Sequence, residues 1–123
     1  MKNPVNYFEI PVWDIERAIS FYEAVFGYTM KRTDIDGHEM ALFPINEEAE
    51  GISGALAKGE SYTPSRKGLR LYFNTADIDE TLKKVLEQGG KILYPKTSVG
   101  ELGWVAEFED IEGNCIALHS VTA

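Results

Sequence analysis

The sequence has a single cysteine, Cys115, and two histidines among its 123 residues. One thiol cannot form an intrachain disulfide, and it excludes a zinc site built from several cysteines. No uninterrupted apolar run approaches the roughly 20 residues that a membrane-spanning helix requires. The first residues, MKNPVNYFEI, also lack the apolar core of a secretory signal peptide. We therefore expect a cytoplasmic protein without a membrane partner.

The chain is also poor in basic residues, with 12 Lys and Arg against 20 Asp and Glu and a net charge of −8. Sequence-independent binding to nucleic acid or to an anionic membrane needs a positive surface, so we expect neither partner. The remaining composition, 44% hydrophobic and 26% charged, is ordinary for a globular protein. At this length we expect one domain, over residues 1–123, with a substantial core.

Residues 7–27 combine the signals of a short strand and of an amphipathic helix. Three apolar residues alternate with Tyr7, Glu9 and Pro11 and predict a strand with one buried face: Phe8, Ile10 and Val12. A helix N-cap follows at Asp14, because its carboxylate can accept a hydrogen bond from the first turn. Six apolar residues then recur at helical spacing before a terminating glycine, Gly27: Ile15, Ala18, Ile19, Tyr22, Val25 and Phe26.

Turn and strand signals alternate through the rest of the first half. A hairpin is predicted from strands at 28–33 and 38–45, joined by a turn at 34–37 that contains glycine. Another strand is predicted at 52–57, after an acidic loop. The following segment, 59–68, is polar and contains Gly, Pro and Ser, which is typical of a linker or mobile loop.

The second half repeats the first. A strand at 69–74 precedes a second capped helix, from Asp77 to Gly89-Gly90, with an apolar stripe of Ile78, Leu82, Val85 and Leu86. Three more strands are predicted at 91–94, 104–108 and 114–121. Asp14 and Asp77 are 63 positions apart, as are Gly27 and Gly90. The sequence therefore predicts an α+β fold of two βαβββ modules, at about 4–58 and 69–121.

These paired modules resemble the vicinal oxygen chelate superfamily, which includes glyoxalase I, extradiol dioxygenases and bleomycin-resistance proteins. Five segments carry the resemblance across essentially the whole chain: Val12–Tyr22, Phe26-Gly27, Tyr72–Leu82, Gly89-Gly90 and Asp110–Leu118. The resemblance implies a curved eight-stranded cup with the helices outside. It also implies a small-molecule ligand in the cup and a homodimer. One fold hosts many chemistries, so it does not name the reaction or the ligand.

Metal-dependent members of that superfamily hold a divalent ion in the cup with four side chains. The resemblance places those positions here at Tyr7, Ala55, Arg70 and Ala117. Alanine has no donor atom, arginine is cationic, and neutral tyrosine is a poor ligand for such ions. We therefore expect no metal bound in the usual way and no cofactor. An unusual site at Glu9 and His119 is a weaker alternative, because two ligands are too few to expect occupancy.

Strand periodicity also predicts which side chains line the cup. One alternating set is expected to face the helices: Phe8, Ile10, Leu69, Leu71, Ile116 and Leu118. The complementary set then faces the cavity: Tyr7, Glu9, Arg70, Tyr72, Ala117 and His119. Glu9 and His119 are the candidate acid–base pair, and Arg70 could hold a carboxylate or phosphate. Three aromatic residues could stack on a ligand: Tyr7, Tyr72 and Trp104.

Structural interpretations of the same residues stay open. Glu9 and Arg70 could form an ion pair within the sheet, His119 could be a partly exposed sheet residue, and Trp104 could belong to the core or to a dimer contact. Two functions follow. One is a small-molecule binding protein of the bleomycin-resistance type. The other is a metal-independent or unusually metallated lyase, isomerase or dioxygenase-like enzyme that uses Glu9 and His119.

Overall fold

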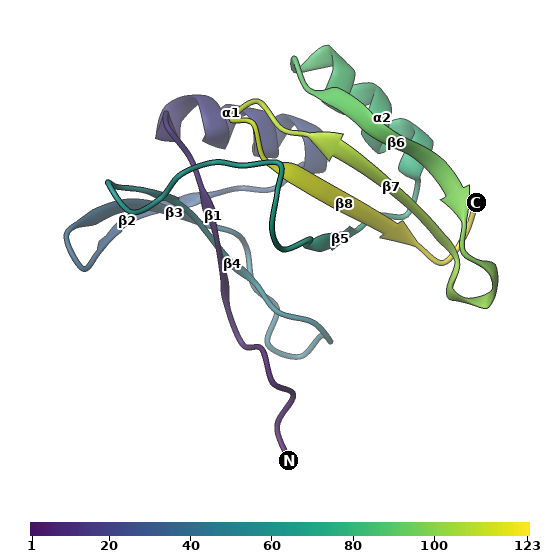
Figure 1. Ribbon diagram of the computed structural model, residues 1–123. Helices are drawn as coiled ribbons and strands as arrows, with labels where there is room; N and C mark the ends of the chain where they lie inside the picture. Colours follow the sequence, from purple (N-terminus) through teal and green to yellow (C-terminus); the bar gives the residue numbers. More distant parts are fainter.

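The computed structural model describes residues 1–123 and contains the two predicted modules (Figure 1). The first consists of β1 (Phe8–Pro11), α1 (Ile15–Phe26), β2 (Lys31–Ile35), β3 (His38–Leu42) and β4 (Gly54–Lys58). The second consists of β5 (Tyr72–Asn74), α2 (Ile78–Glu87), β6 (Lys91–Ser98), β7 (Trp104–Glu109) and β8 (Cys115–Ser120). A short 3-10 turn, Gly100–Leu102, connects β6 to β7.

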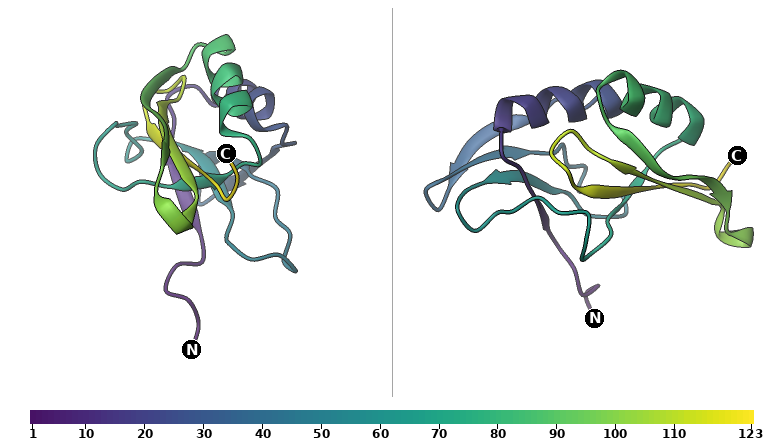
Figure 2. Two further views of the ribbon diagram at one scale, coloured as in Figure 1. Left: turned by 90° about the vertical axis from the view of Figure 1, so that its right-hand side faces the viewer. Right: turned by 45° about the horizontal axis from the view of Figure 1, so that its top comes forward.

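Each module forms its own four-stranded sheet, in the order β1-β4-β3-β2 and β5-β8-β7-β6. In both sheets the first and last strands pair in parallel and the remaining pairs are antiparallel. Both helices lie on the same side of the sheets (Figures 1 and 2), so the opposite faces form the concave side of the molecule. The predicted α+β cup with outer helices is confirmed, although its eight strands form two sheets that are not joined by strand pairing.

The helix signals in the sequence identify both helices. Asp14 accepts a hydrogen bond from the backbone N–H of Arg17 at 3.1 Å, and Asp77 accepts one from Glu80 at 3.1 Å. The first helix ends at Gly27, whose φ of +76° is accessible to glycine at low cost. In α2 one residue of the predicted stripe is misplaced, since Leu86 is 54% exposed.

The strand boundaries differ more from the prediction. The first hairpin turns tightly at Asp36 and Gly37, with φ values of +53° and +77°, so that Ile35 pairs with His38. Positive φ at both central residues is the geometry that suits the twist of a two-residue hairpin. As a result β2 begins three residues later and ends two residues later than predicted, and β3 ends at Leu42. In the second module β6 continues to Ser98, four residues beyond the predicted end.

The prediction that Leu69 packs beneath the helices is wrong, because its side chain is 91% exposed. Regular β5 begins only at Tyr72, after a backbone hydrogen bond from Ala117 N–H to the Leu71 carbonyl. Alternation of apolar residues does not reveal where pairing with β8 begins, and Leu69 precedes that point. The connection between β4 and β5, residues 59–71, therefore contains neither helix nor strand.

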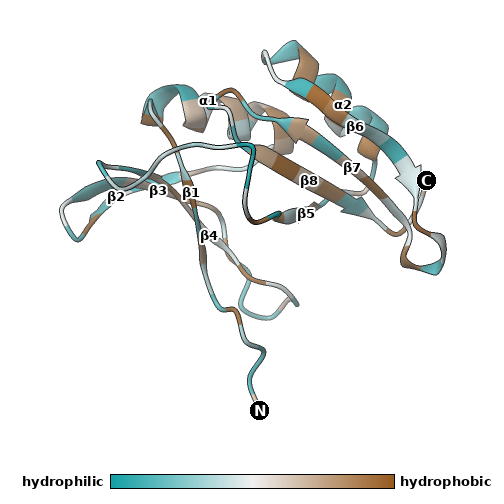
Figure 3. Cartoon of the chain, viewed as in Figure 1, coloured by the Kyte–Doolittle hydropathy of each residue, from teal (hydrophilic) through white to brown (hydrophobic).

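One hydrophobic core joins the two modules. It combines buried residues of both helices and both sheets, and an aromatic cluster lies at its centre: Phe8, Tyr22, Phe26, Phe43 and Phe73. Hydrophobic residues accordingly recur on α1, α2 and β8 (Figure 3). Neither helix has the length and apolar character needed to cross a membrane.

Candidate ligand-binding site

A cavity of about 630 Å³ lies between the two modules. Its walls come from β1 and the residues before it, from the connection between the modules, and from the start of β8: Val5, Tyr7, Phe8, Glu9, Ile10, Pro11, Thr63, Ser65, Lys67, Leu69, Arg70, Leu71, Asn114, Cys115 and Ile116. The volume falls within the range of about 300–1,000 Å³ that is usual for small-molecule sites. The wall is mostly apolar and carries one carboxyl group and two cationic side chains.

Glu9 is the acidic group of this cavity, and two phenols hold its carboxyl group in place. Tyr7 donates a hydrogen bond to Oε2 at 2.9 Å, and Tyr62 donates one to Oε1 at 2.6 Å. Partial burial and then the bond to Glu9 raise the pKa of Tyr7 to about 12. The bond to Glu9 is the main cause of the raised pKa of Tyr62. Both phenols are therefore hydrogen-bond donors at neutral pH.

Arg70 reaches the same cavity but does not pair with Glu9. Its Nε lies 3.0 Å from Oε2 of Glu107 on β7. Hydrogen bonding to Cys115 and the charge of Glu107 raise the pKa of Arg70, while burial raises the pKa of the Cys115 thiol. The ion pair that the sequence suggested for Arg70 is thus present with a different partner, from its own module.

Two other predicted residues, His119 and Trp104, lie apart from Glu9. His119 donates from Nε2 to the Leu102 carbonyl at 2.5 Å, and it does not line the cavity. Trp104 shares the helix-facing side of β7 with Ala106 and Phe108 and packs against the core. The structure therefore brings Tyr7, Glu9 and Arg70 to one cavity, but it does not bring His119 or Trp104 there.

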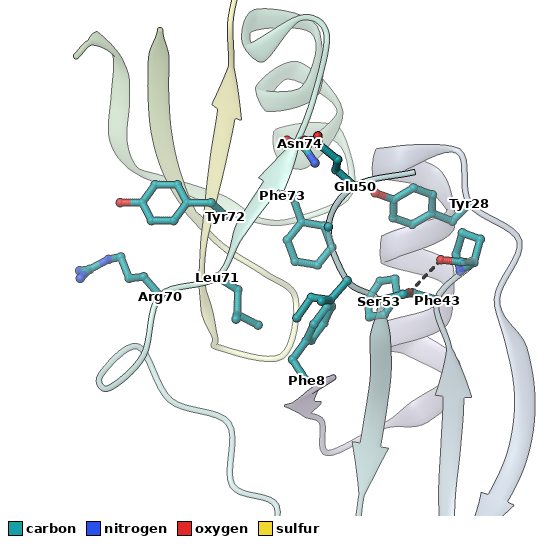
Figure 4. A pocket seen from close by; sticks show the side chains of 13 residues that line it. Phe8, Tyr28, Phe43, Glu50, Ser53, Arg70, Leu71, Tyr72, Phe73 and Asn74 are labelled. Carbon is teal, nitrogen blue, oxygen red and sulfur yellow. Dashed lines mark hydrogen bonds between the residues drawn. The ribbon is translucent and has the colours of Figure 1, made fainter. Parts of the chain in front are cut away.

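Tyr72 lies on the concave side of the second sheet, in a cross-strand row with Ala117 and Glu107. It is 54% exposed and does not line the 630 Å³ cavity. Its backbone contributes to a second, smaller cavity of about 390 Å³ on the other side of Phe8 and Leu71. In this second cavity Phe8, Phe43 and Phe73 converge, while the side chains of Arg70 and Tyr72 point away (Figure 4).

Sequence reasoning missed two contributors from the polar connection, Tyr62 and Lys67. Tyr62 bonds to Glu9, and Lys67 lines the 630 Å³ cavity. The segment 59–68 was predicted to be a linker because of its polarity and its turn residues. One signal was available, since a lone aromatic residue in such a segment is a candidate for packing against the domain.

The side chains at the four positions implied by the family do not fit a divalent cation. Ala55 and Ala117 are buried and have no donor atom beyond the backbone. Tyr7 uses its hydroxyl on Glu9, and Arg70 is a cation paired with Glu107. No group of three or more His, Cys, Asp or Glu side chains is arranged to hold a metal ion.

A buried polar network fixes the position of β1 against the second module, and thereby the shape of the cavity. Asp110 accepts a hydrogen bond from the Tyr22 hydroxyl at 2.7 Å and from the backbone N–H of Asn114 at 2.9 Å. The Asn114 amide donates to the Pro11 carbonyl at 2.8 Å. Burial raises the pKa of Asp110, and these hydrogen bonds oppose that rise. The loop between β7 and β8 is therefore bonded to both β1 and α1.

Comparisons with known proteins agree with this architecture. A "Glyoxylase-like domain-containing protein" from Didymella fabae is 30% identical over 118 residues, which are 93% of this chain and 91% of that protein. The antibiotic binding protein TnmS3 from Streptomyces sp. CB03234 is 25% identical, with a TM-score of 0.69 and coverage of 97% of this chain and 96% of that one.

A glyoxylase/bleomycin resistance protein/dioxygenase domain from Frankia sp. EAN1pec has a TM-score of 0.74 at 17% identity, with 98% of both chains covered. At that identity the likeness concerns the fold alone. The model of the Glyoxalase/Bleomycin resistance protein/Dioxygenase superfamily matches residues 5–118. This chain therefore belongs to that superfamily, the vicinal oxygen chelate superfamily that its motifs resemble.

Proposed function

We propose that this protein binds a small organic molecule in the 630 Å³ cavity and does so without a metal ion. The observation that carries the proposal is the lining of that cavity, in which a phenol-bonded carboxyl group and two cationic side chains adjoin apolar walls. Such a lining suits a ligand with an apolar body and polar substituents. The similarity to an antibiotic binding protein supports the same class of function.

Binding is favoured over catalysis by the arrangement of the ionisable groups. Glu9 and His119, the candidate acid–base pair, make separate hydrogen bonds on separate sheets. A general base and its partner must both lie within hydrogen-bond reach of the reacting atoms. Cys115 is buried and its pKa is raised, which opposes its use as a nucleophile. The enzymatic alternative therefore lacks its predicted second group, His119, beside Glu9.

A large side chain placed in the cavity tests the proposal. Thr63 is an exposed loop residue that lines the cavity, so Thr63→Trp fills space there while leaving the core unchanged. Ligands found by NMR screening of the wild-type protein should bind to Thr63→Trp at least about tenfold more weakly, a loss of about 1.4 kcal/mol. The matched control is Ser61→Trp, which adds the same ring to an exposed neighbour that does not line the cavity.

Equal loss of binding in both variants, or in neither, would place the ligand outside this cavity. The same spectra also address the enzymatic alternative. If a bound ligand is converted to a product over hours by wild-type protein, and not by Glu9→Gln, catalysis rather than storage is the function.

We also propose that the protein is a cytoplasmic homodimer. Exposed apolar side chains on and around the second sheet support an additional protein contact, among them Tyr72, Tyr94, Leu102 and Val121. Sedimentation velocity at micromolar concentration should show a species of twice the 13.8 kDa chain mass. A single 13.8 kDa species under these conditions would contradict the dimer.

A further inference from the structure

Tyr62 reaches out of the connection between the modules and lies on the concave face of the first sheet. Its ring packs against Met40, Ala55 and Ala57, all of which are at most 2% exposed. The two alanines belong to neighbouring cross-strand rows of that sheet. Glu9, Ala55 and Leu42 form one row, and Pro11, Ala57 and Met40 form the next.

The surroundings of Tyr62 have the composition of a site for a phenol. Ala55 and Ala57 lie on the same face of β4 and, being small, leave room above the sheet for a flat ring. Met40 lies beside them and contributes a polarisable thioether to the same apolar surface. The His38 ring meets the Tyr62 ring edge to face, with 5.6 Å between the centroids. The Tyr62 hydroxyl donates to Oε1 of Glu9 at 2.6 Å. An apolar floor, an aromatic wall and one acidic acceptor thus surround a single phenol.

The backbone on either side of Tyr62 makes few hydrogen bonds to the rest of the protein. Ser61 and Thr63, on either side, are exposed. The nearest attachments of the segment are the hydrogen bonds from Tyr62 N–H to the Gly59 carbonyl and from Ser65 N–H to Oδ1 of Asn114, both 3.1 Å, and a longer one from Cys115 N–H to the Ser65 carbonyl at 3.4 Å. The side chain can therefore leave the sheet without breaking a strand or a helix.

Glu9 connects this phenol to the proposed ligand cavity. Glu9 lines the 630 Å³ cavity, and its Oε2 accepts the hydrogen bond from Tyr7. Its Oε1 accepts the hydrogen bond from Tyr62, which does not line that cavity. Removal of the Tyr62 ring would extend the cavity beyond Glu9 onto the floor of Met40, Ala55 and Ala57.

We propose that Tyr62 occupies a binding site for a phenol-bearing ligand and is displaced by that ligand. The ring of the ligand replaces the Tyr62 ring over Ala55 and Ala57, and its hydroxyl replaces the Tyr62 hydroxyl as the donor to Glu9. This inference rests on the proposed function, because it names the chemical class of the ligand. It adds that the wild-type protein lowers its own affinity for such ligands through an internal competitor.

Binding of 4-methylphenol, which reproduces the tyrosine side chain, tests the proposal by NMR titration. Tyr62→Ala should bind 4-methylphenol at least about tenfold more tightly than wild type, because no internal phenol competes. It should also prefer 4-methylphenol to toluene by about tenfold, the effect of a hydrogen bond to a charged acceptor. The matched control is Trp13→Ala, which removes an exposed aromatic side chain before α1 that lines neither cavity and should leave the wild-type affinity unchanged.

A second substitution tests the acceptor. Glu9→Met in the Tyr62→Ala protein retains a side chain of similar length without the carboxyl group, so the preference for 4-methylphenol over toluene should disappear. If Tyr62→Ala fails to fold, Tyr62→Phe serves instead. It keeps the ring but loses the bond to Glu9, and it should bind 4-methylphenol several-fold more tightly than wild type.

Equal affinity of the Tyr62 variants and wild type, or equal affinity for 4-methylphenol and toluene, would overturn the inference. These outcomes differ from failure of the proposed function. If ligands bind more weakly to Thr63→Trp but equally well with and without Tyr62, the proposed cavity stands and the phenol site is refuted. If Tyr62→Ala binds 4-methylphenol selectively but Thr63→Trp weakens no ligand, the phenol site stands and the proposed function of the 630 Å³ cavity is refuted.

Discussion

Replacement of Glu112 by alanine is expected to lower the free energy of unfolding by about 2–3 kcal/mol, the scale of lost hydrogen bonds to a buried charged group. The Glu112 side chain is completely buried between the modules. Its Oε1 accepts the backbone N–H groups of Trp13 at 2.5 Å and Asp14 at 2.9 Å, and its Oε2 accepts Nε of Arg17 at 2.6 Å. Alanine would remove the shared acceptor of two backbone N–H groups and the partner of Arg17, whose side chain is 49% exposed and can still be solvated.

Urea unfolding followed by circular dichroism measures this loss. Glu87→Ala is the matched control, because Glu87 is an exposed acid at the end of α2, where an acidic side chain opposes the helix dipole. Its effect should stay within about 0.5 kcal/mol. A Glu112→Ala protein that loses less than about 1 kcal/mol would show that the buried carboxyl group is not the main tie between the modules.

The contribution of Asp110 to stability depends on pH in the opposite sense to that of a carboxylate in a stabilising ion pair. Its pKa in the folded protein is raised above the ordinary value of 3.8, mainly by burial. Between pH 3.8 and the folded-state pKa, Asp110 is more protonated in the folded protein than in the unfolded chain. The contribution of Asp110 to stability is therefore full below pH 3.8 and decreases as the pH rises through the folded-state pKa.

Phe73→Ala is the second substitution with a large expected effect, a loss of about 3–5 kcal/mol. Phe73 is 8% exposed and lies on the first strand of the second module. Its ring centroid is 5.0 Å from that of Phe26, 5.5 Å from Phe43 and 5.9 Å from Phe8, all in the first module. Alanine would leave a cavity at the centre of the shared core.

The neighbouring Tyr72→Ala is the control for Phe73→Ala. Tyr72 occupies the same strand but points to the concave side and is 54% exposed, so its removal should cost less than about 1 kcal/mol. Both proteins are to be unfolded in urea with a fluorescence and a far-ultraviolet signal recorded together. Comparable losses for the two substitutions would contradict a core that is shared across the modules.

The fold was readable from the sequence because its signals are local. Asp14, Gly27 and Asp77 mark helix ends through hydrogen bonds and backbone conformations within four residues of each cap. The recurrence of these signals at a constant spacing then identified the two modules. Strand ends were less accurate, since they depend on pairing partners elsewhere in the chain, as Leu69 illustrates.

The site was readable only in part. Strand alternation correctly placed Ile10 in the core and Glu9 on the opposite face of β1, but Phe8 and Ile10 also line the cavity. It could not indicate that Glu9 and His119 belong to sheets without strand pairing between them. The contact between Tyr62 and Glu9 spans 53 residues and begins in a loop without periodicity, so no repeating pattern reports it.

The bonds of Glu112 also have a consequence for the origin of the duplicated fold. The backbone donors at the start of α1, Trp13 and Asp14, find their acceptor in the other module. In two separate units with the same loop, this carboxylate could reach those donors only if the units associated. Fusion of two such units converts that association into a unimolecular contact, whose formation no longer depends on protein concentration. The two halves are therefore thermodynamically interdependent.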